Sequence, residues 1–383
     1  MNSRDYFFND EHRAFRETVR RFIQKEVRPR IDEWEHNGCY DRAIFTRMGE
    51  LGFLGLSYPA EYGGQDADIK MSVVFWEELC RCGAMGFPIS VCVQTDMASS
   101  SLNAVGTHEQ KKKYLNPVCR GDKIIAVAMT EPDHGSDVAN IETRAVLDGE
   151  YYRVNGSKMF ITNGTQADVI NTVVRTGGPG YAGVSLLLID SATPGFSVGR
   201  KLEKMGMKSS DTAELVFEDC LVPRENLLGM EGQGFPALMA GLERERLCGC
   251  VLAYMAAQMS MEEAIRFASE RVQFDRPILR HQVIAHMLAD MATEVEAGRR
   301  LAYHAVSLIE AGVPCNKEVS MAKLFCTETS LQVIDRAVQI HGGYGFMDEY
   351  PVSRLYRDAK MGTIAAGTSQ IMRNIIIREM GAR

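Results

Sequence analysis

Between Asn9 and about Gly121 the apolar residues recur every three or four positions, which is the repeat of a helix with one buried face. The segment ELGFLGLSYPAEYGG at 50–64, rich in Gly and Pro, interrupts this repeat, which resumes at 71–82 and 97–114. The first run of apolar positions consists of Phe15, Val19, Phe22, Ile23, Val27, Ile31 and Trp34. The pattern predicts an array of helices over residues 1–121.

From about Asp122 to Pro223 the pattern changes to short β-rich runs separated by turns. Asp-Gly at 148–149 and Asn-Gly at 155–156 are typical of tight turns between strands. Many short strands at this spacing predict a small barrel or a sandwich. After GMEGQGF at 229–235 the helical repeat returns and continues to Arg383, with Gly342-Gly343 as its main break. The order along the chain is therefore helical, then β, then helical.

Composition narrows the class of protein. Of the 383 residues, 45% are hydrophobic and 24% are charged, which is enough for a sizeable core and too apolar for disorder. The net charge of −7, without a long basic stripe, argues against a nucleic-acid partner. No stretch approaches the roughly 20 apolar residues of a membrane span. Because the N-terminus also has no apolar leader, we expect a cytoplasmic protein of prokaryotic origin, with no membrane partner.

The cysteines give no sign of a metal site. There are ten of them, but the chain contains no CxxC pair and no HExxH motif, so no zinc-binding spacing is present. We expect no metal, and we expect most of the cysteines to be reduced and buried.

Candidate chemistry lies in five short stretches rich in small, polar and turn-forming residues. Each stretch alone is compatible with ordinary turn or packing chemistry, and no GxGxxG fingerprint accompanies them. Their joint occurrence in this order is informative. The stretches are AMTEPDHGSD at 128–137, KMFITNG at 158–164, RVQFDRPILRHQ at 271–282, QIHGGYGFMDEYPVSRLYRD at 339–358 and TIAAGTSQIM at 363–372.

Together these stretches resemble the acyl-CoA dehydrogenase family over essentially the whole chain. The chain departs from the family's pattern at His134, Asn140 and Asp275. The resemblance implies an α+β fold with an N-terminal α-helical domain (1–121), a middle β-barrel domain (122–230) and a C-terminal four-helix bundle (231–383). It also implies a homotetramer, non-covalent FAD, an acyl-CoA substrate and an electron-transferring flavoprotein as acceptor. The fourth stretch matches the family at Gln339, Gly342, Gly343, Gly345, Phe346, Glu349, Arg354, Arg357 and Asp358.

The resemblance also assigns roles to residues that would bind the flavin. Phe160 and Thr162 would lie against the isoalloxazine ring, with Thr162 near N5. Residues expected at the flavin or its ribityl chain are Met129, Thr130, Gly135 and Ser136, with Thr368 and Gln370 in the turn beside the flavin. Residues expected at the adenine half are Arg271, Gln273, Phe274 and Gln282, joined by Gln339, Gly342 and Gly343 of a neighbouring subunit.

The catalytic base is not where many members of the family have it, because Ala366 occupies that position. On the helix expected over 235–254, Glu245 follows Leu242 by three residues and precedes Gly249 by four, so it shares their apolar face. Burial on that face should raise its pKa towards the roughly 6 to 7 that suits a general base. The isovaleryl-type and long-chain-type branches of the family also carry their glutamate here.

The resemblance completes the substrate site around this base. Ala366 would keep its backbone N–H as a donor to the thioester carbonyl. Glu243, Arg246 and Ser136 would contact the CoA ester. We expect α,β-desaturation of an acyl-CoA to a trans-2-enoyl-CoA. Because Ala366 is small, a methyl-branched chain, isovaleryl-like or citronellyl-like, is favoured over straight medium chains, and unbranched long chains stay open as an alternative.

Several alternatives stay open at this point. Glu245 could be a structural acid paired with Arg244 or Arg246. Phe160 and Thr162 could be plain packing residues, and His134, His281 and His341 are expected to be structural. The chain could instead be a flavin monooxygenase on the same fold, which needs no α-proton base, or a family member retained as an assembly subunit.

Overall fold

The computed structural model describes residues 6–382, and its N-terminal third is helical as the periodicity predicts. The first helix begins at Asn9, whose side chain accepts a hydrogen bond from the His12 N–H at 3.0 Å. Asp68 caps α4 in the same way, at 2.8 Å from the Met71 N–H. The helices are α1 (Asp10–Phe22), α2 (Ile31–Asn37), α3 (Ala43–Glu50), α4 (Ile69–Cys80), α5 (Gly86–Cys92), α6 (Ser99–Val105), α7 (His108–Gln110) and α8 (Asn116–Cys119).

The middle region is a sheet, and the prediction of a closed barrel is wrong. Seven of its eight strands follow the order β6-β7-β3-β2-β4-β5-β8, and the eighth, β1, pairs with β4. Closure would require the two end strands to pair. However, β8 has two residues and pairs with β5, whereas β6 pairs with β7. The strands are β1 (Ile125–Ala128), β2 (Arg144–Asp148), β3 (Tyr151–Thr162), β4 (Val169–Arg175), β5 (Val184–Asp190), β6 (Phe196–Lys201), β7 (Thr212–Pro223) and β8 (Leu227–Leu228).

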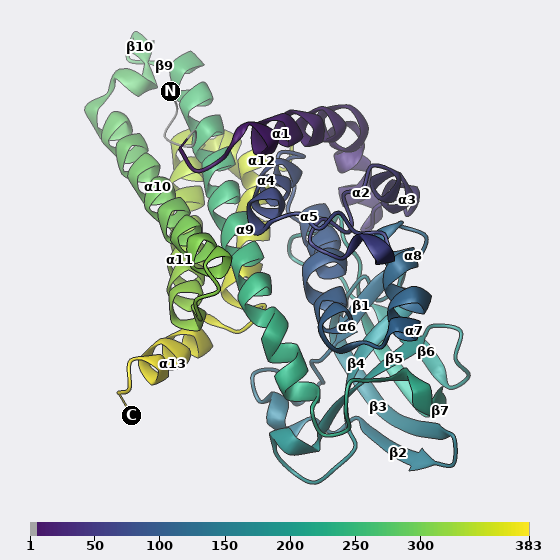
Figure 1. The fold of residues 1–383 in the computed structure, drawn as a ribbon. Helices are drawn as coiled ribbons and strands as arrows, with labels where there is room; N and C mark the ends of the chain where they lie inside the picture. Colours follow the sequence, from purple (N-terminus) through teal and green to yellow (C-terminus); the bar gives the residue numbers. More distant parts are fainter. Residues whose placement is uncertain (1–5, 383) are drawn as a thin grey trace.

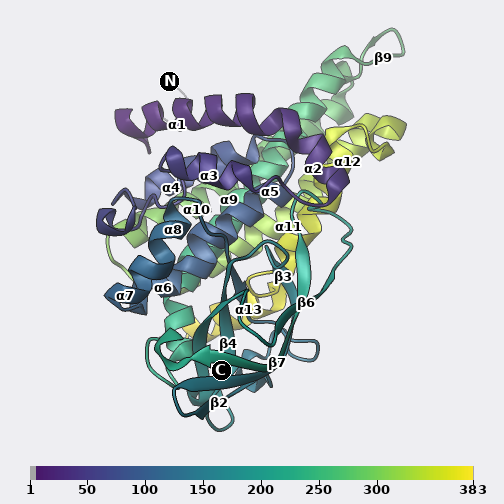
Figure 2. The same ribbon diagram turned by 90° about the vertical axis from the view of Figure 1, so that its right-hand side faces the viewer.

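Helices cover one face of this sheet and bury its hydrophobic side chains. Leu102 of α6 packs in one buried cluster with Val173 of β4, Leu186 of β5 and Leu238 of α9 (Gly234–Glu270). The opposite face has its own cluster, which includes Tyr152, Leu215 and Phe217. Figure 2 shows the strands below the N-terminal helices.

The C-terminal region is a bundle built on three long helices. The first of them, α9 (Gly234–Glu270), runs from the sheet to the far end of the molecule, where it meets the hairpin β9 (Val272–Gln273) and β10 (Arg276–Pro277) (Figure 1). The other helices are α10 (Gln282–Glu310), α11 (Asn316–His341), α12 (Pro351–Ala359) and α13 (Ser369–Glu379). Within residues 6–382 no helix is both long and apolar enough to cross a membrane.

One buried carboxylate ties the three regions together. Asp358 of α12 accepts hydrogen bonds from the N–H of Met85, just before α5, and from the N–H of Met207, in the loop between β6 and β7. Burial is the main influence on Asp358 and raises its pKa to about 6. The largest hydrophobic cluster also crosses regions, since it joins Trp76 of α4 to Leu247 of α9 and Tyr303 of α10. The two helical parts therefore share one core.

Candidate active site

Glu245 lies in the first half of α9 and is half-buried. Burial raises its pKa to about 7, and the positive charges of Arg246 and Lys323 oppose that shift. Within residues 6–382 the carboxylate forms no hydrogen bond or ion pair. One turn further on, Gly249 leaves open space, because a Cβ atom there would meet nothing within 4 Å. The side chain is therefore a desolvated acid beside free volume, as the sequence predicted.

The alternative in which Glu245 is a structural acid requires an arginine partner, and both candidate arginines are engaged elsewhere. Arg244 Nε donates to Asp96 Oδ1 at 2.6 Å. Arg246 Nη1 donates to Asn316 Oδ1 at 2.8 Å. Neither arginine forms an ion pair with Glu245 within the described chain. This geometry leaves Glu245 available as a proton acceptor.

The other residues expected to contact substrate differ in exposure. Arg246 is buried, and its Nε has no hydrogen-bond partner among residues 6–382. Glu243 is half-buried, with one carboxylate oxygen 3.4 Å from the Cys315 N–H. Ser136 is exposed in the loop after β1, next to Gly135, where a Cβ atom would meet nothing within 4 Å.

The turn between η11 (Lys360–Thr363) and α13 presents Ala366. This residue has a φ of 52°, a left-handed conformation that is strained for a residue with a Cβ. No acceptor for its backbone N–H is found among the described residues. Thr368 caps α13, accepting from the Ile371 N–H at 3.3 Å, and Gln370 is exposed. The turn therefore offers a free main-chain donor next to a fixed helix start.

Lys323 of α11 fixes this turn, and sequence reasoning missed it. Its Nζ donates to the main-chain oxygens of Gly362 at 3.3 Å, Ala365 at 2.9 Å and Gly367 at 2.6 Å. Burial lowers its pKa to about 8. The available signal was a lysine at the helical spacing of buried neighbours, namely Val319, Ala322, Cys326 and Thr327.

Four residues expected near the flavin ring, here called the strand-end group, lie at the ends of two neighbouring strands. Met129 and Thr130 follow β1, whereas Phe160 and Thr162 end β3. The pairing of β3 with β7 is irregular between Lys158 and Ile161, and at this irregularity Phe160 has a φ of 63° and is 61% exposed. An exposed aromatic side chain in a strained backbone favours a functional position over plain packing.

A buried ion pair holds the strand-end group together. Lys158 Nζ donates to Glu131 Oε1 at 2.8 Å and to the Met129 oxygen at 3.1 Å. The Met159 N–H donates to the Thr130 oxygen at 2.8 Å. Burial is the largest influence on Glu131, but the charge of Lys158 and several hydrogen bonds oppose it, and the net pKa is lowered. Lys158 was another residue that sequence reasoning did not single out.

Some of the residues predicted to bind the adenine half of FAD meet at the end of the bundle where α9 and α11 end. They line a cleft, here called the bundle-tip cleft. Its volume is about 440 Å³. A Cβ atom at Gly342 or Gly343 would meet nothing within 4 Å, and the Arg271 guanidinium lies 5.7 Å from the centre of the Tyr344 ring. The residues that line the cleft are Phe267, Arg271, Gln273, Ile278, Ile340, His341, Gly342, Gly343, Tyr344 and Met347.

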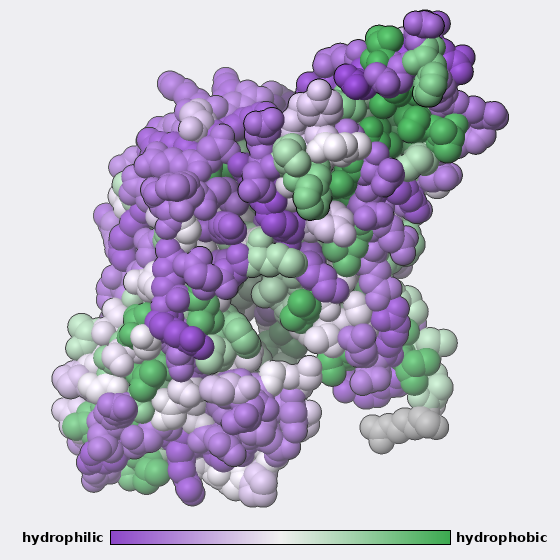
Figure 3. Space-filling view, turned by 180° about the vertical axis from the view of Figure 1, so that it is seen from behind, coloured by the Kyte–Doolittle hydropathy of each residue, from purple (hydrophilic) through white to green (hydrophobic). Residues whose placement is uncertain are grey.

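The cleft brings together residues that the sequence assigned to two subunits. Arg271 and Gln273 share it with Gly342 and Gly343 of the same chain. Three other residues predicted for this half of FAD do not line the cleft and are exposed, namely Phe274, Gln282 and Gln339. Figure 3 shows hydrophobic side chains gathered over this tip, where Phe274 is 88% exposed and Val272, Val283 and Phe346 are also exposed.

The strand-end group and the bundle-tip cleft lie in different regions of the molecule, because the first is on the sheet and the second is where α9 and α11 end. Figure 1 shows β9 and β10 at the top and β3 near the bottom. The end of α9 at Glu270 is about 38 Å along the helix axis from Glu245, at 1.5 Å per residue.

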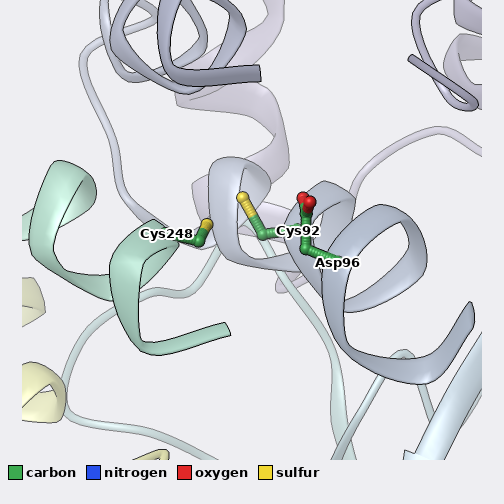
Figure 4. A group of neighbouring side chains, drawn as sticks. All are labelled: Cys92, Asp96 and Cys248. Atoms are coloured by element: carbon green, nitrogen blue, oxygen red, sulfur yellow. The ribbon is translucent and has the colours of Figure 1, made fainter. Parts of the chain in front are cut away.

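Among the described residues one buried cluster has its ligand-type atoms close enough together for a metal ion, but these atoms are not free to bind one. Cys92, Asp96 and Cys248 point toward one another (Figure 4). Both oxygens of Asp96 are already engaged, because Arg244 bonds to one of them and Trp76 bonds to the other at 2.9 Å. Burial raises the pKa of both thiols, which disfavours the thiolate that a metal requires.

Comparison with known proteins agrees with this architecture. Models of the acyl-CoA dehydrogenase N-terminal, middle and C-terminal domains match residues 9–122, 126–220 and 232–381. An acyl-CoA dehydrogenase of Bacillus subtilis is 41% identical over 96% of this chain and 97% of its own length. The crystal structure of an acyl-CoA dehydrogenase from Geobacillus kaustophilus has a TM-score of 0.94 and 42% identity, over 97% of this chain and 98% of that one.

Two further relatives bear on the cofactor and the partner. A glutaryl-CoA dehydrogenase from Mycobacterium smegmatis, solved in complex with FADH2, has a TM-score of 0.93 and 28% identity, over 99% of this chain and 96% of that one. A subunit of the caffeyl-CoA reductase-Etf complex of Acetobacterium woodii is 38% identical over 97% of this chain and 98% of its own length.

The fold and the site thus define a flavin-dependent oxidoreductase that acts on CH–CH groups. The chain belongs to the acyl-CoA dehydrogenase family. FAD is its cofactor, as it is for the family.

Proposed function

We propose that this acyl-CoA dehydrogenase uses Glu245 as its base to desaturate the α,β bond of an acyl-CoA thioester. The observation that carries the proposal is the Glu245 carboxylate itself. It has no partner among residues 6–382, lies beside open space at Gly249 and has a pKa raised to about 7. A general base works best when its pKa is close to the working pH.

In the proposed reaction Glu245 takes one proton from the α-carbon. The free N–H of Ala366 donates to the thioester oxygen and stabilises the negative charge that develops there. FAD, when bound, would supply the acceptor for the hydride that leaves the β-carbon. The two electrons of the broken α C–H bond form the new double bond, so the product is the trans-2-enoyl-CoA.

The residues present fit a bound flavin nucleotide. In the bundle-tip cleft the glycines leave room for close approach of a diphosphate, and Arg271 supplies a positive charge. At the strand-end group the exposed Phe160 and the half-buried Thr162 would face the ring. Met129, Thr130, Gly135, Ser136, Thr368 and Gln370 are proposed to complete the flavin site. We propose that each FAD is bound by two chains, as the resemblance to the family implies, with the strand-end group of one chain and the bundle-tip cleft of another. We therefore propose a homo-oligomer, namely a tetramer.

For the substrate we propose a methyl-branched acyl chain, isovaleryl-like or citronellyl-like. The support is the small side chain of Ala366, together with the absence of a Cβ at Gly249. We propose an electron-transferring flavoprotein as acceptor, in line with the relative named as part of an Etf complex.

An anaerobic titration of the purified yellow protein tests the function. Straight-chain, 3-methyl-branched and terpenoid acyl-CoA esters are added in turn, and bleaching of the oxidised flavin band is followed. Bleaching by the branched esters at the lowest concentrations is expected. If no ester bleaches a fully bound flavin, the dehydrogenase proposal fails. In that case, rapid oxygen consumption by the reduced protein would point to the monooxygenase, and a colourless protein would point to an assembly subunit.

A further inference from the structure

Lys323 is a buried cation whose hydrogen-bond partners are all main-chain oxygens. It is 2% exposed, and within residues 6–382 it forms no ion pair. Its ammonium has three N–H donors, and the three oxygens of Gly362, Ala365 and Gly367 match that number. A buried charge is costly unless it is well satisfied. The three bonds fix the main chain of one half-buried turn, and the positions of the acceptors show which part of the turn is fixed.

Two of the acceptors flank Ala366. The oxygen of Ala365 and the N–H of Ala366 belong to the same peptide unit, which is planar and trans, so the two groups point in opposite directions. A donor that holds the Ala365 oxygen therefore also sets the direction of the Ala366 N–H. A cation on the oxygen polarises the unit as well, which makes the N–H a stronger donor. The second contact, to the Gly367 oxygen at 2.6 Å, holds the main chain on the other side of the left-handed Ala366.

We propose that Lys323 is a positioning residue that aims and polarises the Ala366 N–H toward the thioester oxygen, an inference that rests on the proposed function. Lys323 also acts on the other half of the site, because its charge favours the ionised form of Glu245. One cation thus serves both the donor that stabilises the developing charge and the carboxylate that takes the proton. Neither effect requires Lys323 to touch the substrate.

The test isolates proton removal from hydride transfer. An acyl-CoA analogue with sulfur in place of the β-methylene group can lose an α-proton but has no β-hydride to give. Uptake of solvent deuterium at its α-carbon, measured by mass spectrometry on the holoenzyme, reports Glu245 and the Ala366 donor alone. In Lys323→Met we expect this exchange to fall about 10- to 100-fold, because the donor is misdirected. Bound FAD and the affinity for the analogue should change little.

Two further variants serve as controls. Lys323→Arg keeps a cation with several donors and should recover much of the exchange. Ser330→Ala removes another buried polar side chain of α11, one without a hydrogen-bond partner in the described chain, and should behave as wild type. Exchange in Lys323→Met that stays within about twofold of wild type, with FAD bound, would overturn the role of Lys323. If the wild-type protein exchanges no analogue at all, the proposed function itself fails.

The pH dependence of the exchange rate tests the role of Lys323 even if Lys323→Met does not fold. The charged and titratable groups around Lys323 are Glu245, Arg246 and Cys250, all on α9, whereas η11 and the turn present main-chain oxygens. Wild-type exchange should rise as Glu245 loses its proton near pH 7 and fall as Lys323 loses its own near pH 8. In Lys323→Arg the upper limb should disappear, because arginine stays protonated. An upper limb that persists unchanged in Lys323→Arg contradicts the proposal.

Discussion

The strand-end group and the bundle-tip cleft differ in how much of each one chain completes. The first is held by its own chain: the Lys158–Glu131 ion pair and the bond from the Met159 N–H to Thr130 join two distant segments. The second is open, and aromatic side chains such as Phe274 and Phe346 are exposed around it. The difference fits the proposal above, in which the strand-end group orients the flavin ring within one chain and the bundle-tip cleft binds the far half of FAD only together with a second chain.

This contrast predicts that chemistry and cofactor affinity can be lost separately. The largest effect should come from Glu245→Gln, which keeps the size of the side chain but removes the base. We expect flavin reduction by the best acyl-CoA to slow by about 10³-fold, within the range for loss of a general base. FAD content should be unchanged. Rapid-mixing absorbance measures the rate.

Glu263→Gln is the matched control for that change. It removes a carboxylate from the same helix, one that pairs with Arg266 and lies outside both sites, so it should reduce the flavin at the wild-type rate. Flavin reduction by Glu245→Gln at a rate close to that of this control would remove Glu245 as the base.

A smaller, different loss is expected from Arg271→Gln in the bundle-tip cleft. Loss of a hydrogen bond from a charged group costs about 1.5 to 3 kcal/mol, so the dissociation constant of FAD should rise about 10- to 100-fold. Enzyme saturated with FAD should still reduce its flavin at nearly the wild-type rate. Reconstitution of the apoprotein measures the affinity. Arg266→Gln, on the neighbouring turn of α9 and outside the cleft lining, should leave the affinity unchanged.

Co-expression of the two variants sharpens the comparison. If each FAD joins two chains, a pair made of one Glu245→Gln chain and one Arg271→Gln chain contains one site with both wild-type halves. Random pairing then restores roughly a quarter of the sites at limiting FAD. If each FAD is bound within one chain, the mixture restores none.

The sequence predicted the fold class and the residues with recognisable local patterns, and it failed where the outcome depended on distant partners. Helical periodicity placed Glu245 on an apolar face, and its raised pKa and free carboxylate agree. The barrel was wrong because strand spacing gives the number of strands and not whether the end strands pair. Lys158 and Lys323 were missed because a lone lysine in a strand or helix carries no sign of the oxygens it will meet.

The smallest effect tests whether the strand-end group stores strain. Phe160 has a φ of 63°, which costs about 1 to 2 kcal/mol for a residue with a Cβ, whereas glycine has no such cost but loses about 0.5 to 1 kcal/mol of chain entropy. Phe160→Gly should therefore stabilise the apoprotein by about 0.5 to 1 kcal/mol while it weakens flavin binding. Thermal unfolding of the apoprotein measures the first effect. A destabilised apoprotein would mean that Phe160 contributes packing that its 61% exposure does not reveal, and the strain would then have no functional meaning.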